Sequence, residues 1–230
     1  MKLNQSIKTS KSLAIAALAG MALTVTSAHA VVVFTGAGTA TEVTGAELSY
    51  TTDVSATDLI NGLTATTGTG WNTASGATLA ELNDGIHGGN FAAEGNTVQG
   101  AWSGAGAVAE YNLGLGASAL GYDITSIQTI AAWQGGVLGN QDYKIEVKAV
   151  GGIYTELASV DFGALTGGGA TKVTMSGLDV TGIESIRFTA DDASVFRELD
   201  VIGVDTVPEP SAVALLGLGG LALLRRRRRD

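Results

Sequence analysis

The chain has 230 residues, a formal net charge of −9 and no cysteine. Without cysteine it has no disulfide framework, no thiolate metal site and no thiol nucleophile. The acidic balance argues against nucleic-acid binding, because phosphate groups would be repelled.

Residues 1–30 have the pattern of a secretory signal helix. Three lysines precede an apolar stretch over residues 13–25, which is the order of charged and apolar regions in such signals. Ala28 and Ala30 place small side chains where signal peptidase selects its site, so we expect cleavage after Ala30. The apolar stretch is shorter than the roughly 18–20 residues of a spanning helix.

Residues 31–206 form the expected domain, which carries five basic and twenty acidic residues. A formal charge of −15 suits divalent cations, although it also suits simple solubility. An exported domain without disulfides must rely on its hydrophobic core or on bound metal such as Ca²⁺.

The domain is predicted to be all-β. Short apolar segments at residues 31–34, 46–51 and 59–65 are expected strands, and residues 66–106 form a Gly-, Asn- and Ser-rich region with little periodicity. Beyond it, strands are expected over 108–113, 124–133, 143–148, 153–157, 173–175, 183–188 and 196–204. Gly151-Gly152 predicts a hairpin. Many short strands and no amphipathic helix indicate a β-sandwich.

Residues 207–230 are predicted to be a sorting signal rather than part of the folded core. A Pro-Glu-Pro triplet precedes an uncharged run over residues 211–224 and a block of arginines. The run is short for a membrane helix, but flanking arginines can extend its reach and are expected to stay cytoplasmic. The residues of this pattern are Pro208, Glu209, Pro210, Arg225, Arg226, Arg227, Arg228 and Arg229.

This order resembles the PEP-CTERM sorting tail of Gram-negative surface proteins. The resemblance implies recognition by an exortase-type membrane protease, a short hydrophobic helix, transient inner-membrane association, and a final location at the cell surface or in the extracellular matrix. It leaves open whether the tail is cleaved and what replaces it.

A second resemblance spans about residues 59–203. Leu82-Asn83-Asp84-Gly85, then Ala109 to Gly114, Asp142 to Val147, Ile186 to Phe188 and Arg197 to Gly203 follow one another. This order is similar to the galactose-binding-like jelly roll of discoidin and coagulation factor C-type domains. Two departures are the missing tryptophan after Asp84-Gly85 and the missing terminal cysteine pair.

The jelly-roll resemblance implies a structural Ca²⁺ site. Asp84 and Glu198 match the positions that hold calcium in that fold, and backbone carbonyls of residues 85–91 would complete its oxygen ligands. The alternative is that Asp84 forms only an Asx turn before Gly85, and that Glu198 is a solvated strand residue.

Glycan binding is the second implied activity, because such modules stack sugar rings on exposed aromatics. Trp71 and Trp102 lie in Gly-rich segments and are the candidate platforms, whereas Trp133 follows an apolar strand and is expected in the core.

An enzymatic role is not expected. His87 is the one histidine of residues 31–206, which excludes a multi-histidine zinc site. Acid pairs such as Asp191-Asp192 are better explained by cation binding or solvation than by glycoside hydrolysis.

We therefore expect a non-enzymatic, exported glycan-binding or adhesion module of an exopolysaccharide matrix or biofilm. The alternatives are a purely structural matrix protein without a specific ligand and a divergent glycan-acting enzyme.

Overall fold

The computed structural model describes residues 31–37, 57–72, 78–85, 100–133 and 136–208. Within these ranges the chain forms eight strands and one short 3₁₀ helix. They are β1 (Val31–Ala37), β2 (Thr67–Asn72), η2 (Leu79–Leu82), β3 (Ala101–Asn112), β4 (Tyr122–Trp133), β5 (Gln141–Ala149), β6 (Tyr154–Phe162), β7 (Gly169–Ala190) and β8 (Ser194–Asp205).

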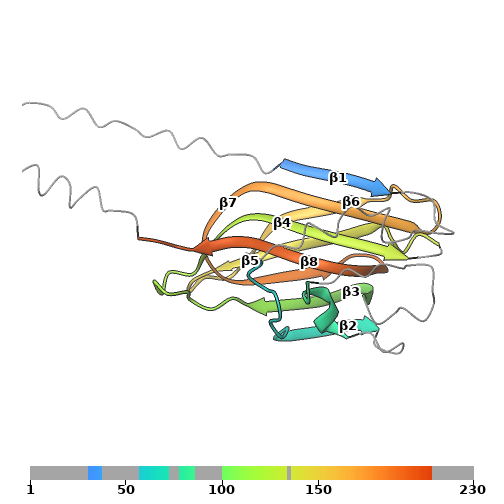
Figure 1. Cartoon of the computed structure of the whole chain (residues 1–230). Helices are drawn as coiled ribbons and strands as arrows, with labels where there is room; N and C mark the ends of the chain where they lie inside the picture. The colour runs from blue at the N-terminus through green and yellow to red at the C-terminus, as the bar shows by residue number, and fades with distance from the viewer. Residues whose placement is uncertain (1–30, 38–56, 73–77, 86–99, 134–135, 209–230) are drawn as a thin grey trace, which may run out of the picture.

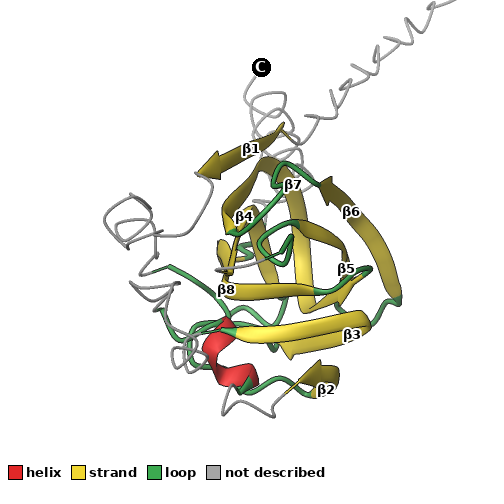
Figure 2. Ribbon diagram, turned by 90° about the vertical axis from the view of Figure 1, so that its right-hand side faces the viewer, coloured by secondary structure: helices red, strands yellow, loops and turns green. Residues whose placement is uncertain are grey.

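The strands pair antiparallel and form two layers around one core (Figures 1 and 2). In the first layer, β4 lies between β8 and the first half of β7, and β1 pairs with the outer side of that half. In the second layer, β5 lies between β6 and the second half of β7, while β3 joins β7 to β2.

Strand β7 passes from one layer to the other. Its residues 169–176 pair with β4, and its residues 183–190 pair with β5 and β3. The change of direction falls at Gly177, Asp179 and Gly182, which all have positive φ angles, a conformation that favours glycine.

Pairings of β3 with β8, β8 with β4, β4 with β7 and β7 with β3 close a ring. The predicted all-β, jelly-roll type of sandwich is therefore confirmed.

Buried and partly exposed side chains alternate along the strands, and the buried ones form the core. In β5 every second residue from Gln141 to Val147 is buried, as expected for a strand with one face on the interior. Aromatic rings fill the centre: Tyr143 and Phe188 have centroids 4.4 Å apart, and Phe188 and Phe196 pack edge to face at 5.0 Å. Such contacts add to the free energy gained by burying the apolar area.

A buried polar network crosses the core beside these rings. The Thr129 hydroxyl bonds to the side chains of Gln141 and Tyr143, and the Gln141 amide donates to the carbonyl oxygen of Thr171 at 3.0 Å. Because each group finds a partner, the burial of these polar atoms is compensated.

One expected strand was wrong, and one region contains more regular structure than its sequence indicated. Residues 59–65 are a turn joined to β8 by a single bridge at Asp58, because Gly62 adopts a φ of 68° and the Leu63 N–H bonds back to Ile60. The region 66–106, in which the sequence showed little periodicity, contains the short elements β2 and η2 and the start of β3.

The predicted signal helix, the predicted strand at 46–51 and the predicted tail helix lie outside the described residues. Among the residues that are described, no helix has the length and apolar character to span a bilayer.

Candidate functional site

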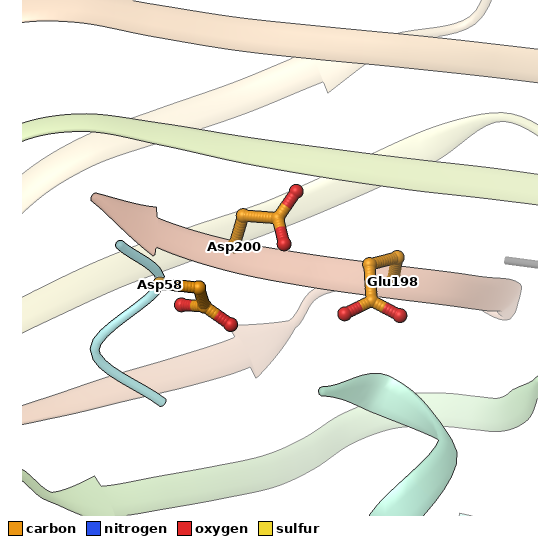
Figure 3. A group of neighbouring side chains, drawn as sticks. All are labelled: Asp58, Glu198 and Asp200. Carbon is orange, nitrogen blue, oxygen red and sulfur yellow. The ribbon is translucent and has the colours of Figure 1, made fainter. Parts of the chain in front are cut away.

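Three carboxylates gather where the last strand meets the segment before β2 (Figure 3). Glu198 and Asp200 belong to β8, and Asp58 lies beside it at the start of the turn. One oxygen from each of the three lies within 4.8 Å of the others. Asp58 is half-buried, whereas Glu198 and Asp200 are buried.

The local structure explains how the three side chains meet. Glu198 and Asp200 are two residues apart, so a strand presents them on one face. Asp58 is fixed by its own backbone neighbours: its Oδ1 accepts hydrogen bonds from the N–H groups of Ile60 at 3.1 Å and Val201 at 2.8 Å. The carboxylate of Asp58 thus joins the turn to β8.

Glu198 joins a second segment to the same strand. Its Oε1 accepts a hydrogen bond from the backbone N–H of Gly85, which follows η2. Within the described part of the chain, the second oxygen, Oε2, is buried and has no hydrogen-bond partner, and the same holds for Oδ2 of Asp58. Burying a carboxylate oxygen without a partner costs free energy of folding. A bound ligand at these two atoms would offset that cost.

Electrostatics point to a cation as that ligand. Burial, followed by the charge of Asp200, raises the pKa of Glu198 to about 9. Burial raises the pKa of Asp58 to about 6, although two backbone hydrogen bonds act against it. The charges that act on Glu198 are those of Asp200, Asp84 and Asp58, which are all acidic. A bound divalent cation would neutralise this repulsion.

The donor set fits a hard cation. Three carboxylates supply oxygen ligands of the kind that Ca²⁺ prefers, and Ca²⁺ requires six to eight oxygens in total. Asp200 also accepts a hydrogen bond from the Gln128 amide at 3.1 Å through Oδ2, which orients its carboxylate. The cluster is therefore a candidate metal centre.

The sequence predicted Asp84 and Glu198 as the metal ligands. Asp84 is exposed and is not one of the three clustered residues, but its charge acts on Glu198 and its neighbour Gly85 bonds to Glu198. Residues 86–91, expected to add backbone carbonyls, lie outside the described part of the chain. The pair stays a prediction.

Trp71 is half-buried and packs against the core, and its predicted role as a glycan platform stays a prediction. Its indole N–H donates to the carbonyl oxygen of Val108 at 2.8 Å, and its ring packs edge to face against Phe196 at 6.2 Å. A ring held in this way is a core contact that also ties β2 to β3.

Trp102 and Trp133 form a pair. The ring centroids are 5.7 Å apart, the planes are tilted by 45°, and both side chains are half-buried. Trp102 stands near the start of β3 and Trp133 at the end of β4, so the pair lies at one end of the sandwich. Trp133 had been expected in the core alone.

Four acids lie at the same end as the tryptophan pair. Burial raises the pKa of Asp142, and the charges of Asp161, Asp191 and Asp192 raise it further. Asp161, Asp191 and Asp192 are exposed, which fits the solvated role expected of the Asp191-Asp192 pair. His87 lies outside the described residues.

Sequence reasoning missed Asp58 as a partner of Glu198 and Trp133 as a partner of Trp102. The spacing of Glu198 and Asp200 in one strand was a usable signal, but Asp58 lies 143 residues before the Val201 N–H that it binds. A contact between residues so far apart in the sequence cannot be predicted from a local pattern.

Comparison with protein families identifies the end of the chain. Residues 206–229 match the PEP-CTERM protein-sorting motif. This match confirms the predicted sorting tail and marks the chain as an exported protein that is sorted at the cell envelope through its C-terminal segment. No curated protein matches the chain.

Several solved structures are similar to the chain at low sequence identity. The lectin domain of lectinolysin complexed with Lewis B antigen is 14% identical, with 65% of this chain and 98% of that chain covered and a TM-score of 0.44. The C-terminal domain of a chitobiase from Bacteroides fragilis is 14% identical, with 64% and 96% covered and a TM-score of 0.45. A fucose-binding module from Streptococcus pneumoniae is 13% identical, with 63% and 94% covered and a TM-score of 0.43.

Proposed function

We propose that the protein is a non-catalytic glycan-binding or adhesion module of the cell surface or extracellular matrix. Residues 1–30 are its signal peptide, residues 31–206 its β-sandwich domain and residues 207–230 its sorting signal. Signal peptidase and an exortase-type protease process the two ends, and an exopolysaccharide or other glycan is the ligand.

The pairing of Trp102 with Trp133 is the observation that carries this proposal. The two half-buried rings meet at 5.7 Å at the end of the sandwich where β4 finishes. Aromatic rings with one exposed part present an apolar surface, which suits the apolar face of a sugar ring. Val137, which precedes the Leu138 carbonyl that bonds to Val195, lies at the same end and is 49% exposed.

Polar groups lie close to the tryptophan pair. Ser103, which follows Trp102, bonds through its hydroxyl to the carbonyl oxygen of Asp192 at 3.2 Å. The turn at residues 191–193 is therefore adjacent to the pair, and it carries two exposed carboxylates. Carboxylates accept hydrogen bonds from sugar hydroxyl groups, so an apolar platform and polar acceptors occur together.

The acidic cluster has a structural role in this proposal. Glycoside hydrolysis needs two carboxylates that the substrate can reach, about 5–9.5 Å apart. Glu198 is 0% exposed and Asp200 is 1% exposed, so a glycan cannot contact them. A cation bound there would instead join the Gly85 segment to β8 and stabilise the fold.

Glycan binding is tested with the full chain on an array of bacterial polysaccharides and oligosaccharides, followed by titration of any ligand found. Trp102→Ala and Trp133→Ala should each weaken binding at least tenfold. Tyr154→Ala is the matched control, because Tyr154 is an aromatic residue half-buried on β6 beneath Arg187, and it should leave affinity unchanged.

The purely structural matrix protein is the second candidate, and the contacts of the half-buried Trp71 with Val108 and Phe196 favour it, because they tie that ring to the fold. Absence of binding to every glycan tested, with a normally folded chain, would support this candidate. Equal losses of affinity in Tyr154→Ala and Trp102→Ala would show that the tryptophan pair is not the site.

A further inference from the structure

Exposed apolar side chains gather at one end of the sandwich. Within the described residues, seven large hydrophobic side chains are exposed, and six of them lie at the end where β8 finishes. We call these six the tail-side rim. They are Leu115, Leu120, Val150, Ile153, Val204 and Val207, with exposed fractions of 45, 40, 40, 80, 59 and 72%.

Hydrogen bonds connect the segments that carry the rim. The loop between β3 and β4 closes on itself through the Gly121 N–H and the Leu115 carbonyl at 2.8 Å. The N–H of Thr206 then donates to the carbonyl of Gly121 at 3.0 Å. On the other layer, the Val150 N–H donates to the carbonyl of Gly182, whose own N–H donates to the Thr206 hydroxyl. Hydrogen bonds therefore connect the loop after β3, the turn of β7, the turn after β5 and the end of β8.

Six exposed apolar side chains at one end of a domain indicate that another molecule covers them. Single exposed apolar side chains are ordinary, but a patch of them at one place marks an interaction surface. The seventh exposed residue, Val137, lies at the opposite end, where β8 begins, since Val195 bonds to the adjacent Leu138. Apolar exposure is therefore concentrated on one end and not spread over the sandwich.

The position of the sorting tail indicates that lipid covers the rim. Val207 belongs both to the rim and to the matched sorting motif, which covers residues 206–229. The uncharged run starts at Ser211, four residues later, and four extended residues span at most about 14 Å. A tail inserted in a bilayer therefore holds the rim at the lipid surface.

The first strand adds a second connection at this end. Val31 pairs with Ser176, directly before the turn at which β7 changes layers. The predicted signal segment thus joins the domain at the same end as the tail, as Figure 1 shows for the two ends of the described chain. The described chain therefore begins near the end of the sandwich at which β8 finishes.

We propose that the tail-side rim is a lipid-contacting surface, which seats the sandwich on the bilayer while the sorting tail is inserted. Exposed Asp179 and Asp205 lie at the same end, so an anionic surface would repel it and a neutral one is the better match. The tryptophan pair then faces away from the membrane. The inference does not depend on glycan binding.

The test uses the absence of native cysteine. Single cysteines at Ile153→Cys, Leu120→Cys and Val137→Cys are introduced into the full chain, labelled with bimane and reconstituted in phosphatidylcholine vesicles that contain nitroxide-labelled lipid. Val137→Cys is the matched control, because it replaces an exposed aliphatic residue at the far end. Bimane at positions 153 and 120 should emit at shorter wavelength and be quenched at least twofold more than at 137.

Equal quenching at positions 153, 120 and 137 would overturn the proposal. Protection of position 153 from aqueous iodide without quenching by the lipid nitroxide would also overturn it, because protein and not lipid would then cover the rim. Glycan binding is measured on the same labelled chains, so failure of one proposal is distinguishable from failure of the other.

Discussion

The carboxylate of Glu198 accepts a hydrogen bond from the backbone N–H of Gly85, 113 residues earlier in the chain, at 3.2 Å. This contact joins the segment after η2 to the last strand. Among the residues that the structure describes, the second oxygen of the same carboxylate has no hydrogen-bond partner and is buried. One side chain therefore both fixes a long-range contact and points toward the candidate metal centre.

Calcium should raise the melting temperature of the full chain, because a ligand that binds only the folded state stabilises it by mass action. Glu198→Gln keeps the side-chain shape but removes a charged ligand, and should abolish most of the calcium response. Asp161→Asn is the control, since Asp161 is an exposed acid at the far end. Calorimetry with calcium or with chelator provides the measurement; an undiminished response in Glu198→Gln would exclude this metal centre.

Without calcium, stability should fall as pH rises. Glu198 has an ordinary pKa of 4.5 and a folded-state pKa of about 9. The folded state therefore holds this proton more tightly, and the resulting stabilisation is complete below about pH 4.5 and lost as pH rises toward 9. Chemical denaturation in chelator across that range, compared between the wild type and Glu198→Gln, should show a flatter profile in the variant. Parallel profiles would contradict the assignment.

Thr129→Val should destabilise the domain by about 1–3 kcal/mol, because buried polar groups lose their partners. The Thr129 hydroxyl contacts Gln141 and Tyr143, and all three residues are 0% exposed. Thr125→Val is the control in the same strand, since Thr125 is exposed and water can replace its hydrogen bond. Urea denaturation measures both; similar losses would show that the network contributes little.

Gly121→Ala should lower the free energy of unfolding more than Gly114→Ala does. Both glycines have nearly equal positive φ angles, 84° and 81°, so the backbone strain of about 1–2 kcal/mol is shared. A Cβ at 121 would lie 2.8 Å from backbone atoms of Gly182 and Ile183, whereas one at 114 meets nothing within 4 Å. The difference in unfolding free energy, expected to be at least about 1 kcal/mol, isolates the contact; equal costs would contradict the close approach of the two loops.

Arg187→Gln should lower stability by about 1 kcal/mol and more at low salt, since partly exposed charges are screened. The guanidinium bonds to Glu110 at 2.9 Å, lies 3.6 Å from Glu146 and sits 3.7 Å from the ring centre of Tyr154. Lys148→Gln removes a single ion pair with Glu184 and should cost less. Melting at two salt concentrations compares them, and equal losses would argue against the network around Arg187.

The hairpin of β5 and β6 could be predicted from the sequence because its signals are local. Alternation over Tyr143 to Lys148 defines one buried face, and Gly151-Gly152 marks the turn. The segment at 59–65 has apolar residues of the same kind but forms a turn, since Asp58 and Gly62 favour a bend there. Composition alone does not separate a short strand from a buried turn.

The candidate site was predictable only where its residues share a strand. Glu198 and Asp200 could be placed on one face from their spacing. Asp58 reaches its partners through an isolated bridge to β8, and Trp133 meets Trp102 because β3 and β4 both pair with β8. Such contacts follow from the order in which the strands pair, so they cannot be predicted from neighbouring residues in the sequence.

Strand β8 links closure of the sandwich to the start of the sorting motif. It lies between β3 and β4, supplies two of the three clustered carboxylates, and ends at Asp205, directly before the matched sorting motif. Without β8, strands β3 and β4 lose the partner that lies between them, and the ring of strands stays open. Closure of the domain therefore depends on the stretch of chain that ends one residue before the sorting motif.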